Sequence, residues 1–351
     1  MSKTTSLYVY SMEQQDIWDG IVRSFKDYDA YWLCGYVKAF FIHGDGEPYL
    51  FYYEKDDLRA INVVMKRDIA EDKKFKGKIE QGKYYDFATP YGYGGWLIEG
   101  SGNKQLLFHE YEKWCNKHNI ISEFVRFHPI IENHKNVSEE YEIVEKGECV
   151  VINTAVEEDI FANMTSTCRN RMRKAKKNGI NIFWGRTPEM FETFKTIYDE
   201  TMKGDKASEY YFFGERFFES VLNDLPYNTQ VFYAQTESKE IISAAVMLTT
   251  NGMMNFHLGG TIKEYQHLAP VNLLFSQAAM WANRNGYRTL YLGGGVGSSN
   301  DSLLHFKKTF NRNGYRKFCI GRKIFSKDRY TQLLSLRGEM ENTDYFPLYR
   351  A

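Results

Sequence analysis

The chain has 351 residues, 43% of them hydrophobic, which is enough for two domains with substantial cores. Lys plus Arg and Asp plus Glu both number 45, so the net charge is zero and does not indicate a general affinity for nucleic acid or acidic membranes. Five scattered cysteines without a CxxC motif, an N-terminus without an apolar signal core and the lack of a membrane-length apolar run predict a soluble cytoplasmic protein with reduced thiols and no transmembrane segment.

The first 150 residues predict a mixture of helices and strands. Runs rich in aromatic and β-branched residues indicate strands, and longer runs with helical spacing of apolar residues indicate helices. The predicted order is helix 16–25, helix 35–42, paired strands 48–54 and 60–69, a strand within 84–96 that ends in a glycine-aromatic turn, helix 104–118 and strand 122–129.

A strand at 148–154 marks the predicted domain boundary, near Val150. The predicted order that follows is a basic helix over 160–178 with Gly179 as its C′ residue, strand 180–184, helices 188–202 and 214–223, strands 229–235, 241–250 and 252–260, helix 273–285, strand 289–294, a helix from Ser302 and strand 318–325. This order fits an α+β domain with a mixed sheet, and the first half is a looser version of it. We therefore predict two similar domains side by side, residues 1–150 and 151–351.

The glycine-rich stretch 293–310, GGGVGSSNDSLLHFKKTF, is a poor phosphate cradle, because no Gly-Lys-Ser/Thr ending and no G-x-G-x-x-G spacing follows its glycines. In the helix after it, Lys307 falls inside the apolar arc formed by Leu303, Phe306 and Phe310, whereas Lys308 falls outside. A lysine on an apolar face either extends its ammonium to water or meets a partner or a ligand.

The basic helix concentrates six cations in residues 169–177, and no acid occurs from 161 to 188. Arg169, Arg173 and Lys176 share a polar face, separate from a predicted buried stripe of Met164, Cys168, Met172 and Ala175. This face either holds a pyrophosphate or RNA backbone or is a solvated helix surface.

Four further residues carry polar or aromatic groups that suit substrate binding. Tyr91 and Tyr93 of PYGYGGW could hold a ligand by stacking and hydroxyl contacts, or simply pack within a tight turn. Arg126 and His128 share a strand face, where Arg126 could bind an anion or pair with an acid such as Glu123.

His257 is either a core histidine or a residue that positions or deprotonates an amine. The histidines and cysteines show no metal-ligand spacing and no nucleophile elbow occurs, so we expect neither a metal site nor a Ser-His-Asp triad.

Several stretches together resemble the FemABX family: residues 257–295 followed by DSLLHFKKTF, then TCRNRMRKAKKNGI, YGYGGW and SEFVRFHP. The resemblance implies two tandem GNAT-like domains, each with a mixed, largely antiparallel sheet flanked by helices, and it extends to acyltransferases of the BioF2-like group. It also implies transfer of an amino acid from aminoacyl-tRNA to an amine of a peptidoglycan precursor. The family's phenylalanine-lysine pair falls on Phe306 and Lys307, and the lysine is thought to stabilise charge at the acyl centre.

Two departures qualify this resemblance. The turn that binds pyrophosphate in CoA-dependent GNAT enzymes falls on residues 266–271, where both glycine-type positions are changed and Pro270 has no N–H to donate. Tyr91 matches a family tyrosine, but Gly94 and Trp96 replace the arginine and proline of an Arg-Gly-Pro motif.

We therefore expect an amide-forming transferase that modifies an amine of a cell-envelope precursor, either a peptide stem or a nucleotide-activated sugar. No cofactor is expected to be tightly bound, and the donor would be aminoacyl-tRNA or acyl-CoA. Catalysis is assigned to Lys307 and His257, and substrate binding to Tyr91, Tyr93, Arg126, His128, Arg169, Arg173 and Phe306. The alternatives are an acyl-CoA-dependent N-acyltransferase and a non-catalytic module that binds RNA or a nucleotide. DNA is not an expected partner.

Overall fold

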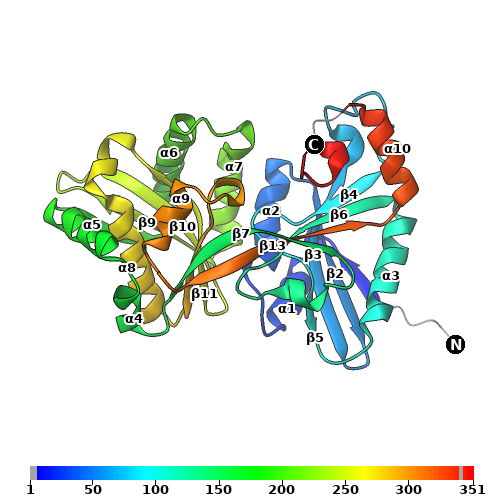
Figure 1. The fold of residues 1–351 in the computed structure, drawn as a ribbon, viewed down its shortest axis with the longest axis horizontal. Helices are drawn as coiled ribbons and strands as arrows, with labels where there is room; N and C mark the ends of the chain where they lie inside the picture. The colour runs from blue at the N-terminus through cyan, green and yellow to red at the C-terminus, as the bar shows by residue number, and fades with distance from the viewer. Residues whose placement is uncertain (1–5, 340–342) are drawn as a thin grey trace. The chain divides into compact units, whose positions relative to one another are not determined.

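A computed structural model describes residues 6–339 and 343–351 (Figure 1). Its contacts divide the chain into two compact units, residues 1–145 with 318–351, and residues 146–317. Residues 318–351 thus group with the first unit rather than with the second. The predicted limits, 1–150 and 151–351, differ from this division chiefly because they assign residues 318–351 to the second domain.

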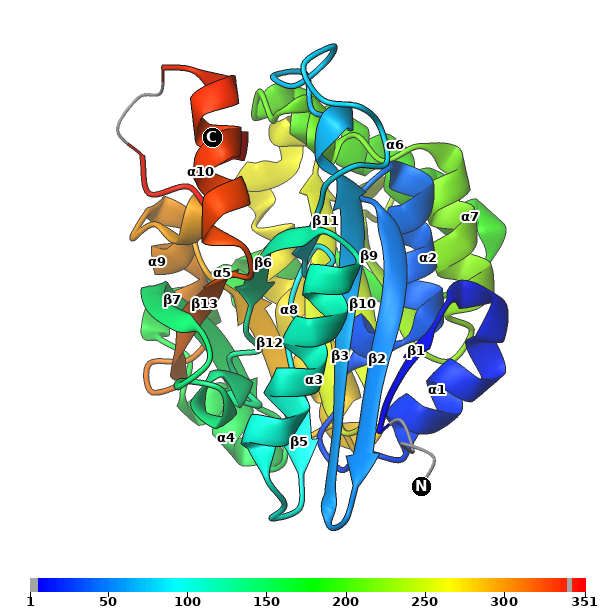
Figure 2. The same ribbon diagram turned by 90° about the vertical axis from the view of Figure 1, so that its right-hand side faces the viewer.

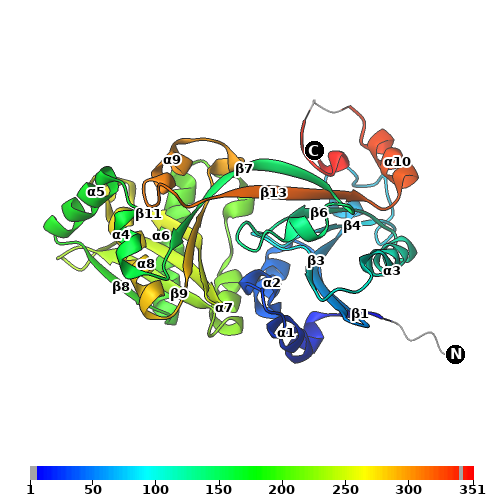
Figure 3. The ribbon, with the colours of Figure 1, turned by 60° about the horizontal axis from the view of Figure 1, so that its bottom comes forward.

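The first unit contains a mixed sheet of order β1-β2-β3-β4-β6-β13, with β5 beside β3. Its helices α1 and α2 cover one face of the sheet and α3 covers the other (Figure 3). β2 and β3 form a long antiparallel hairpin (Figure 2). The elements are β1 (Leu7–Tyr10), α1 (Gln15–Arg23), α2 (Cys34–His43), β2 (Glu47–Lys55), β3 (Leu58–Asp68), β4 (Tyr85–Ala88), β5 (Leu97–Glu99), α3 (Lys104–Lys117), β6 (Ile120–Arg126), β13 (Tyr315–Ile324) and α10 (Lys327–Arg337).

The second unit contains a sheet of order β7-β12-β11-β10-β9-β8. α5 packs on α8, and α8 packs on the sheet together with α4 and α9, whereas α6 contacts β10 and β11 and packs on α7 (Figure 1). The elements are β7 (Glu142–Asn153), α4 (Glu157–Ala162), α5 (Ser166–Lys177), β8 (Asn181–Gly185), α6 (Pro188–Gly204), α7 (Glu215–Asp224), β9 (Thr229–Gln235), β10 (Ile241–Thr250), β11 (Met253–Thr261), α8 (Pro270–Arg284), β12 (Thr289–Gly293) and α9 (Ser302–Lys308).

The two units share one plan, which confirms the predicted α+β class with a mixed, largely antiparallel sheet in each half. In the first unit the antiparallel strands β2, β3 and β4 lead through α3 to β6, which lies parallel to β4. In the second unit β9, β10 and β11 lead through α8 to β12, which lies parallel to β11. A helix is the ordinary connection between parallel neighbours, because such a crossover must return the chain to the starting end of the sheet.

Each sheet ends in a strand that comes from the part of the chain following the other sheet. β7 follows β6 in sequence, yet its residues 150–153 pair with β12 of the second unit. β13 follows β12, yet its residues 320–324 pair with β6 of the first unit. This reciprocal strand exchange explains why the C-terminal segment groups with the N-terminal unit.

Local signals locate most of the predicted elements within a few residues, but β1 and β5 were not predicted, and there are three further differences. The basic helix predicted over 160–178 is interrupted at residues 163–165, where Thr165 caps α5 by accepting a hydrogen bond from the Cys168 backbone N–H at 3.2 Å. α8 begins at Pro270 rather than at residue 273, because proline suits the first helical position. α10, near the C-terminus, was not predicted.

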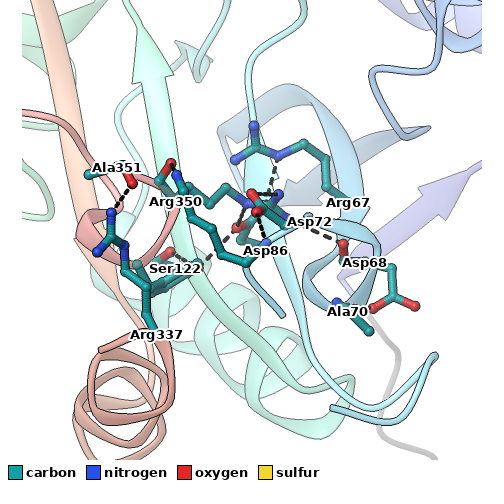
Figure 4. Close-up of polar contacts among 11 residues, drawn as sticks. Arg67, Asp68, Ala70, Asp72, Asp86, Ser122, Arg337, Arg350 and Ala351 are labelled. Atoms are coloured by element: carbon teal, nitrogen blue, oxygen red, sulfur yellow. Dashed lines mark hydrogen bonds and ion pairs between the residues drawn. The ribbon is translucent and has the colours of Figure 1, made fainter. Parts of the chain in front are cut away.

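The last residues are tied to the first unit by a buried ionic network (Figure 4). Asp86 has no exposed surface and accepts hydrogen bonds from Arg67 Nε at 2.8 Å and Arg350 Nε at 2.6 Å. The Tyr349 hydroxyl donates to the same carboxylate at 3.0 Å. Burial acts to raise the pKa of Asp86, but the two guanidinium charges outweigh it and hold that pKa below its usual value.

Within the residues described, no helix is both long and apolar enough to span a membrane.

Candidate active site

The parallel strands β11 and β12 pair over only three residues and then part. Their register runs from Met253 opposite Thr289 to Asn255 opposite Tyr291. Beyond Asn255, β11 continues against β10 as far as Thr261, while β12 continues against β7. The loop after β12, where the two strands have parted, reaches Lys307 through Gly294.

Lys307 extends from α9 to the end of β12. Asp301 caps this helix, because its carboxylate accepts a hydrogen bond from the Leu304 N–H at 2.8 Å. The Lys307 ammonium donates to the Gly294 carbonyl oxygen at 2.7 Å and lies 5.7 Å from the centre of the Phe256 ring. No carboxylate in the described part of the chain forms an ion pair with it.

The environment of Lys307 makes its charge costly. Only 6% of the residue is exposed, so the alternative in which its ammonium extends to water does not hold. Burial lowers the pKa of Lys307 to about 8, and the distant charge of Asp301 opposes this only in part. Lys308, the next residue, is different, because its ammonium forms a 2.7 Å ion pair with Glu148 at the surface. The two lysines therefore differ as the helical pattern predicted, but Leu303 of the predicted apolar arc is exposed.

His257 follows Phe256 on β11 and lies at a β-bulge. Val246 of β10 is opposite Leu258 and Met247 is opposite Phe256, so the register passes over His257. A bulge of this kind redirects a side chain and is common beside active sites. Burial of the imidazole lowers the pKa of His257 to about 3, so the ring is neutral at physiological pH.

A cavity of about 480 Å³ lies where the first turns of α5 and α8 meet the end of α9. Its lining is mostly uncharged, with Arg171 as its one cation and several hydroxyl and amide groups. The lining residues are Thr167, Cys168, Arg171, Thr261, Gln266, Ala269, Pro270, Val271, Asn272, Phe306 and Thr309. Phe306 is thus the one residue of the predicted site that lines the cavity, and it is the immediate neighbour of Lys307.

The cations of α5 have unequal surroundings. The Arg169 guanidinium donates to the carbonyl oxygens of Phe161 and Met164, where it closes the end of α4. Arg173 is exposed and donates to Asn170 Oδ1 at 2.7 Å. Arg171, which was not among the predicted site residues, is the cation on the cavity wall. Met164 and Cys168 of the predicted stripe are buried, as are Met172 and Ala175.

The four predicted binding residues of the N-terminal half gather in one aromatic cluster of the first unit. Tyr93 is largely buried and has ring contacts with Tyr31 at 5.3 Å and His128 at 5.5 Å between centres. Tyr91 stacks on Phe40 at 5.7 Å. Between the two tyrosines, Gly92 has φ +99°, and a Cβ there would come within 2.4 Å of the Tyr31 ring, so only glycine fits this turn.

His128 lies two residues beyond the end of β6 and is fully buried. Its Nδ1 accepts hydrogen bonds from the N–H groups of Ile130 and Ile131, so Nε2 carries the proton and donates to Asp29 at 2.9 Å. This arrangement favours a structural role over ligand binding for the ring, and the predicted contact with substrate stays untested.

Arg126 donates from Nε to the Gly92 carbonyl at 2.9 Å and lies 4.9 Å from the Phe318 ring centre. The suggested pair between Arg126 and Glu123 was wrong. Residues three apart on a strand point to opposite faces, and the Glu123 carboxylate is instead bonded to Tyr111, Tyr141 and Asn62.

The described residues contain no group of three or more histidine, cysteine or acidic side chains that could hold a metal ion.

Comparisons with known proteins agree with this geometry. Residues 162–308 match the family model described as an acetyltransferase (GNAT) domain. The structure resembles FemX, with a TM-score of 0.64, 11% identity, and coverage of 93% of this chain and 99% of that one. The chain has a FemABX-type, GNAT-like fold. L-PGS from Bacillus licheniformis is also similar, with a TM-score of 0.58, 13% identity and coverage of 92% and 96%. The search among curated proteins found no match.

Within this FemABX-type fold, the cavity contains part of the 266–271 turn that sequence reasoning compared with a pyrophosphate site, but that reasoning missed Arg171, Asn272 and Thr309 as site residues. Arg171 of α5, Asn272 of α8 and Thr309, just after α9, are far apart in the chain, so no local pattern joins them. One signal was available: an asparagine in the first turn of α8, inside the otherwise apolar run PVNLLF, is a polar residue at a buried helix position.

Proposed function

We propose that the protein is an amide-forming acyl- or aminoacyltransferase that acts on an amine of a cell-envelope precursor, either a peptide stem or a nucleotide-activated sugar. The observation that carries this proposal is the Lys307 ammonium, which is buried, unpaired with any carboxylate of the described chain, and held at the loop after β12 by a backbone carbonyl. The fold shared with FemX supports the same reaction class.

The reaction needs no covalent enzyme intermediate. The neutral amine attacks the donor carbonyl carbon, a C–N bond forms, and the carbonyl electron pair moves to the oxygen. The bond from carbon to the leaving oxygen or sulfur then breaks, and the proton lost by the amine balances the charge of the leaving group. The protein must bring the two reactants together and stabilise the oxyanion.

Lys307 supplies the stabilising charge. An ammonium has three N–H donors, and one of them is used on Gly294, which fixes the direction of the other two. A cation fixed in a site with little water interacts with a developing oxyanion more strongly than it would in bulk solvent.

His257 has a positioning role in this scheme. With a pKa of about 3, its neutral ring is too weak a base to take a proton from an alkylammonium. The amine must therefore arrive deprotonated, and the proton that it loses after the attack goes to the leaving group.

The donor is assigned to the second unit, with its activated acyl end near Lys307 and the adjoining group in the 480 Å³ cavity beside Phe306. Aminoacyl-tRNA and acyl-CoA are both candidates. The GNAT match over residues 162–308 favours acyl-CoA, whereas Pro270, at the first position of α8, removes one of the N–H groups that a pyrophosphate would use.

A direct test offers the purified protein charged tRNA and acyl-CoA in parallel, together with a pool of envelope precursors, and searches for new amides by mass spectrometry. Amide formation from one donor, dependent on Lys307, is the expected result. Salt-dependent RNA binding without any product would instead favour the non-catalytic module.

A further inference from the structure

The cavity beside Lys307 contains a buried amide with poor partners. Asn272 occupies the first turn of α8 and is 7% exposed. Its Nδ2 donates to Cys168 Sγ at 3.7 Å, and in the described part of the chain its side-chain oxygen accepts no hydrogen bond. A thiol sulfur is a weak acceptor, and the amide oxygen is not among the buried polar atoms that lack a partner, so it is open to the cavity that Asn272 lines.

The surroundings of Asn272 show what kind of group it would meet. Cys168 is 1% exposed, and burial raises the pKa of its thiol, so the sulfur is neutral and unreactive. Thr309 adds a hydroxyl to the same wall of the cavity, and no ionisable carboxylate or amine lines it. The inner part of the cavity therefore favours a neutral group with hydrogen-bonding atoms.

The outer part of the cavity has the opposite character. Arg171 is exposed, lies one helical turn beyond Cys168 on α5, and forms no ion pair with any acid in the described residues. The first turn of α8 adds backbone N–H groups at Val271 and Asn272 that have no acceptor within the helix. A cation and a helix N-terminus at one rim favour an anion such as a phosphate.

We propose that Asn272 is a specificity-determining residue of this cavity, which binds the donor as a phosphate ester with its phosphate toward Arg171 and a neutral amide, hydroxyl or base edge against Asn272. Cys168 holds the amide in position through a bond weak enough for the ligand to replace. This assignment rests on the proposed function only in calling the ligand the donor.

The test measures binding by calorimetry on the full chain, with adenosine 5′-monophosphate, coenzyme A and inorganic phosphate as probes. Asn272→Leu, which has nearly the same shape, should weaken both esters about tenfold and leave inorganic phosphate unchanged, because only the esters bring a neutral group to the amide. Arg171→Met should weaken all three probes. Lys174→Met, three residues along α5, exposed and off the cavity, is the control and should change none.

Two substitutions of Cys168 distinguish a role of Asn272 in ligand recognition from a role in packing. Cys168→Ser provides a stronger acceptor that competes for the amide, so ester binding should weaken. Cys168→Ala removes the acceptor, so ester binding should hold or improve, although both variants shrink the side chain. Equal effects of the two substitutions, or an Asn272→Leu variant that binds the esters normally, would overturn the proposal.

Two further outcomes decide the source of the ligand and its relation to catalysis. Binding of only one ester shows which donor chemistry the cavity takes, and binding of neither by the folded wild-type chain overturns the proposal. Lys307→Met should bind the esters normally, so its loss of turnover would leave this proposal intact. Normal binding without any turnover in the wild type would contradict the proposed function alone.

Discussion

At the scale of single residues, Lys307 is the side chain on which the proposed chemistry depends. Lys307→Met keeps the stem volume while removing the charge, so α9 should stay packed. Turnover should fall about a hundredfold or more, as when a transition-state donor is lost. Thermal stability should hold or rise, because an ammonium that is 6% exposed is costly to bury.

Lys308→Met is the control for this experiment, because Lys308 lies one position along and pairs with Glu148 at the surface. It should change neither rate nor melting temperature appreciably. If the two methionine variants have the same rate, Lys307 takes no part in catalysis.

The pH dependence of the rate gives a second test of Lys307. Because its pKa is lowered to about 8, the ammonium is charged below that pH and loses its proton above it. Single-turnover rates should therefore decline as pH rises through about 8, provided that the acceptor amine is saturating. A rate that rises through pH 8 and then levels in the wild type, but not in Lys307→Met, would indicate that neutral Lys307 acts as a base.

The charge of Lys307 should make stability depend on pH in the opposite direction to the rate, with stability rising as pH rises above about 8. The folded pKa of about 8 lies below the usual value of 10.5, so between these values the unfolded chain binds more protons than the folded one. Wild-type stability should therefore gain relative to Lys307→Met as pH rises from 8 to 10.5, and denaturant titrations at several pH values would measure this gain.

At the scale of elements, the structure divides the cations of α5 into different roles. Arg171→Glu should lower affinity for phosphate-bearing ligands and flatten the salt dependence of binding, because a cation at the cavity rim becomes an anion. The fold should be unaffected, since this side chain is exposed. Binding isotherms at several salt concentrations would measure both effects.

Arg169→Glu should act on stability instead. It removes the donors that close the end of α4 and places a negative charge beside the carbonyl oxygens of Phe161 and Met164. A loss of about 1–2 kcal/mol in the free energy of unfolding is expected, measured by chemical denaturation. An Arg169→Glu variant of normal stability with weakened ligand binding would restore the original polar-face assignment.

At the scale of the whole molecule, the exchanged strands make the two halves depend on one another. A chain ending at residue 317 lacks the part of β13 that pairs with β6, and it also lacks the buried side chains of Leu333 and Tyr349. The first unit should then lose most of its hydrogen-exchange protection. A chain ending at residue 338 retains β13 and should be intermediate.

The ionic network around Asp86 tests how much the contacts of the C-terminal residues stabilise the first unit. Asp86→Asn leaves the Arg67 and Arg350 charges without their carboxylate, at an expected cost of about 2–4 kcal/mol. Because the folded pKa of Asp86 is lowered, its contribution is present above the ordinary carboxyl pKa and is lost as pH falls through the folded value. Acid titration of the wild type and of Asp86→Asn should therefore converge at low pH.

The sequence by itself determined most of the elements and the exceptional position of Lys307. Apolar spacing located α9 and separated Lys307 from Lys308, because the period of a helix is a local property. Alternating and aromatic runs located β2, β3 and the meander β9 to β11 for the same reason. The repeated order of helices and strands predicted the two-unit plan, and the family resemblance implied the same plan.

Only the tertiary structure decided what lies beside these elements. The strand exchange between β7 and β13, the cavity that joins Arg171 to Asn272, and the binding of Arg350 to Asp86 all bring together residues far apart in sequence. Local patterns record which face of an element is buried but not what it is buried against. Long-range pairing is fixed by the packing of the whole chain, where the partners of a buried polar group are chosen.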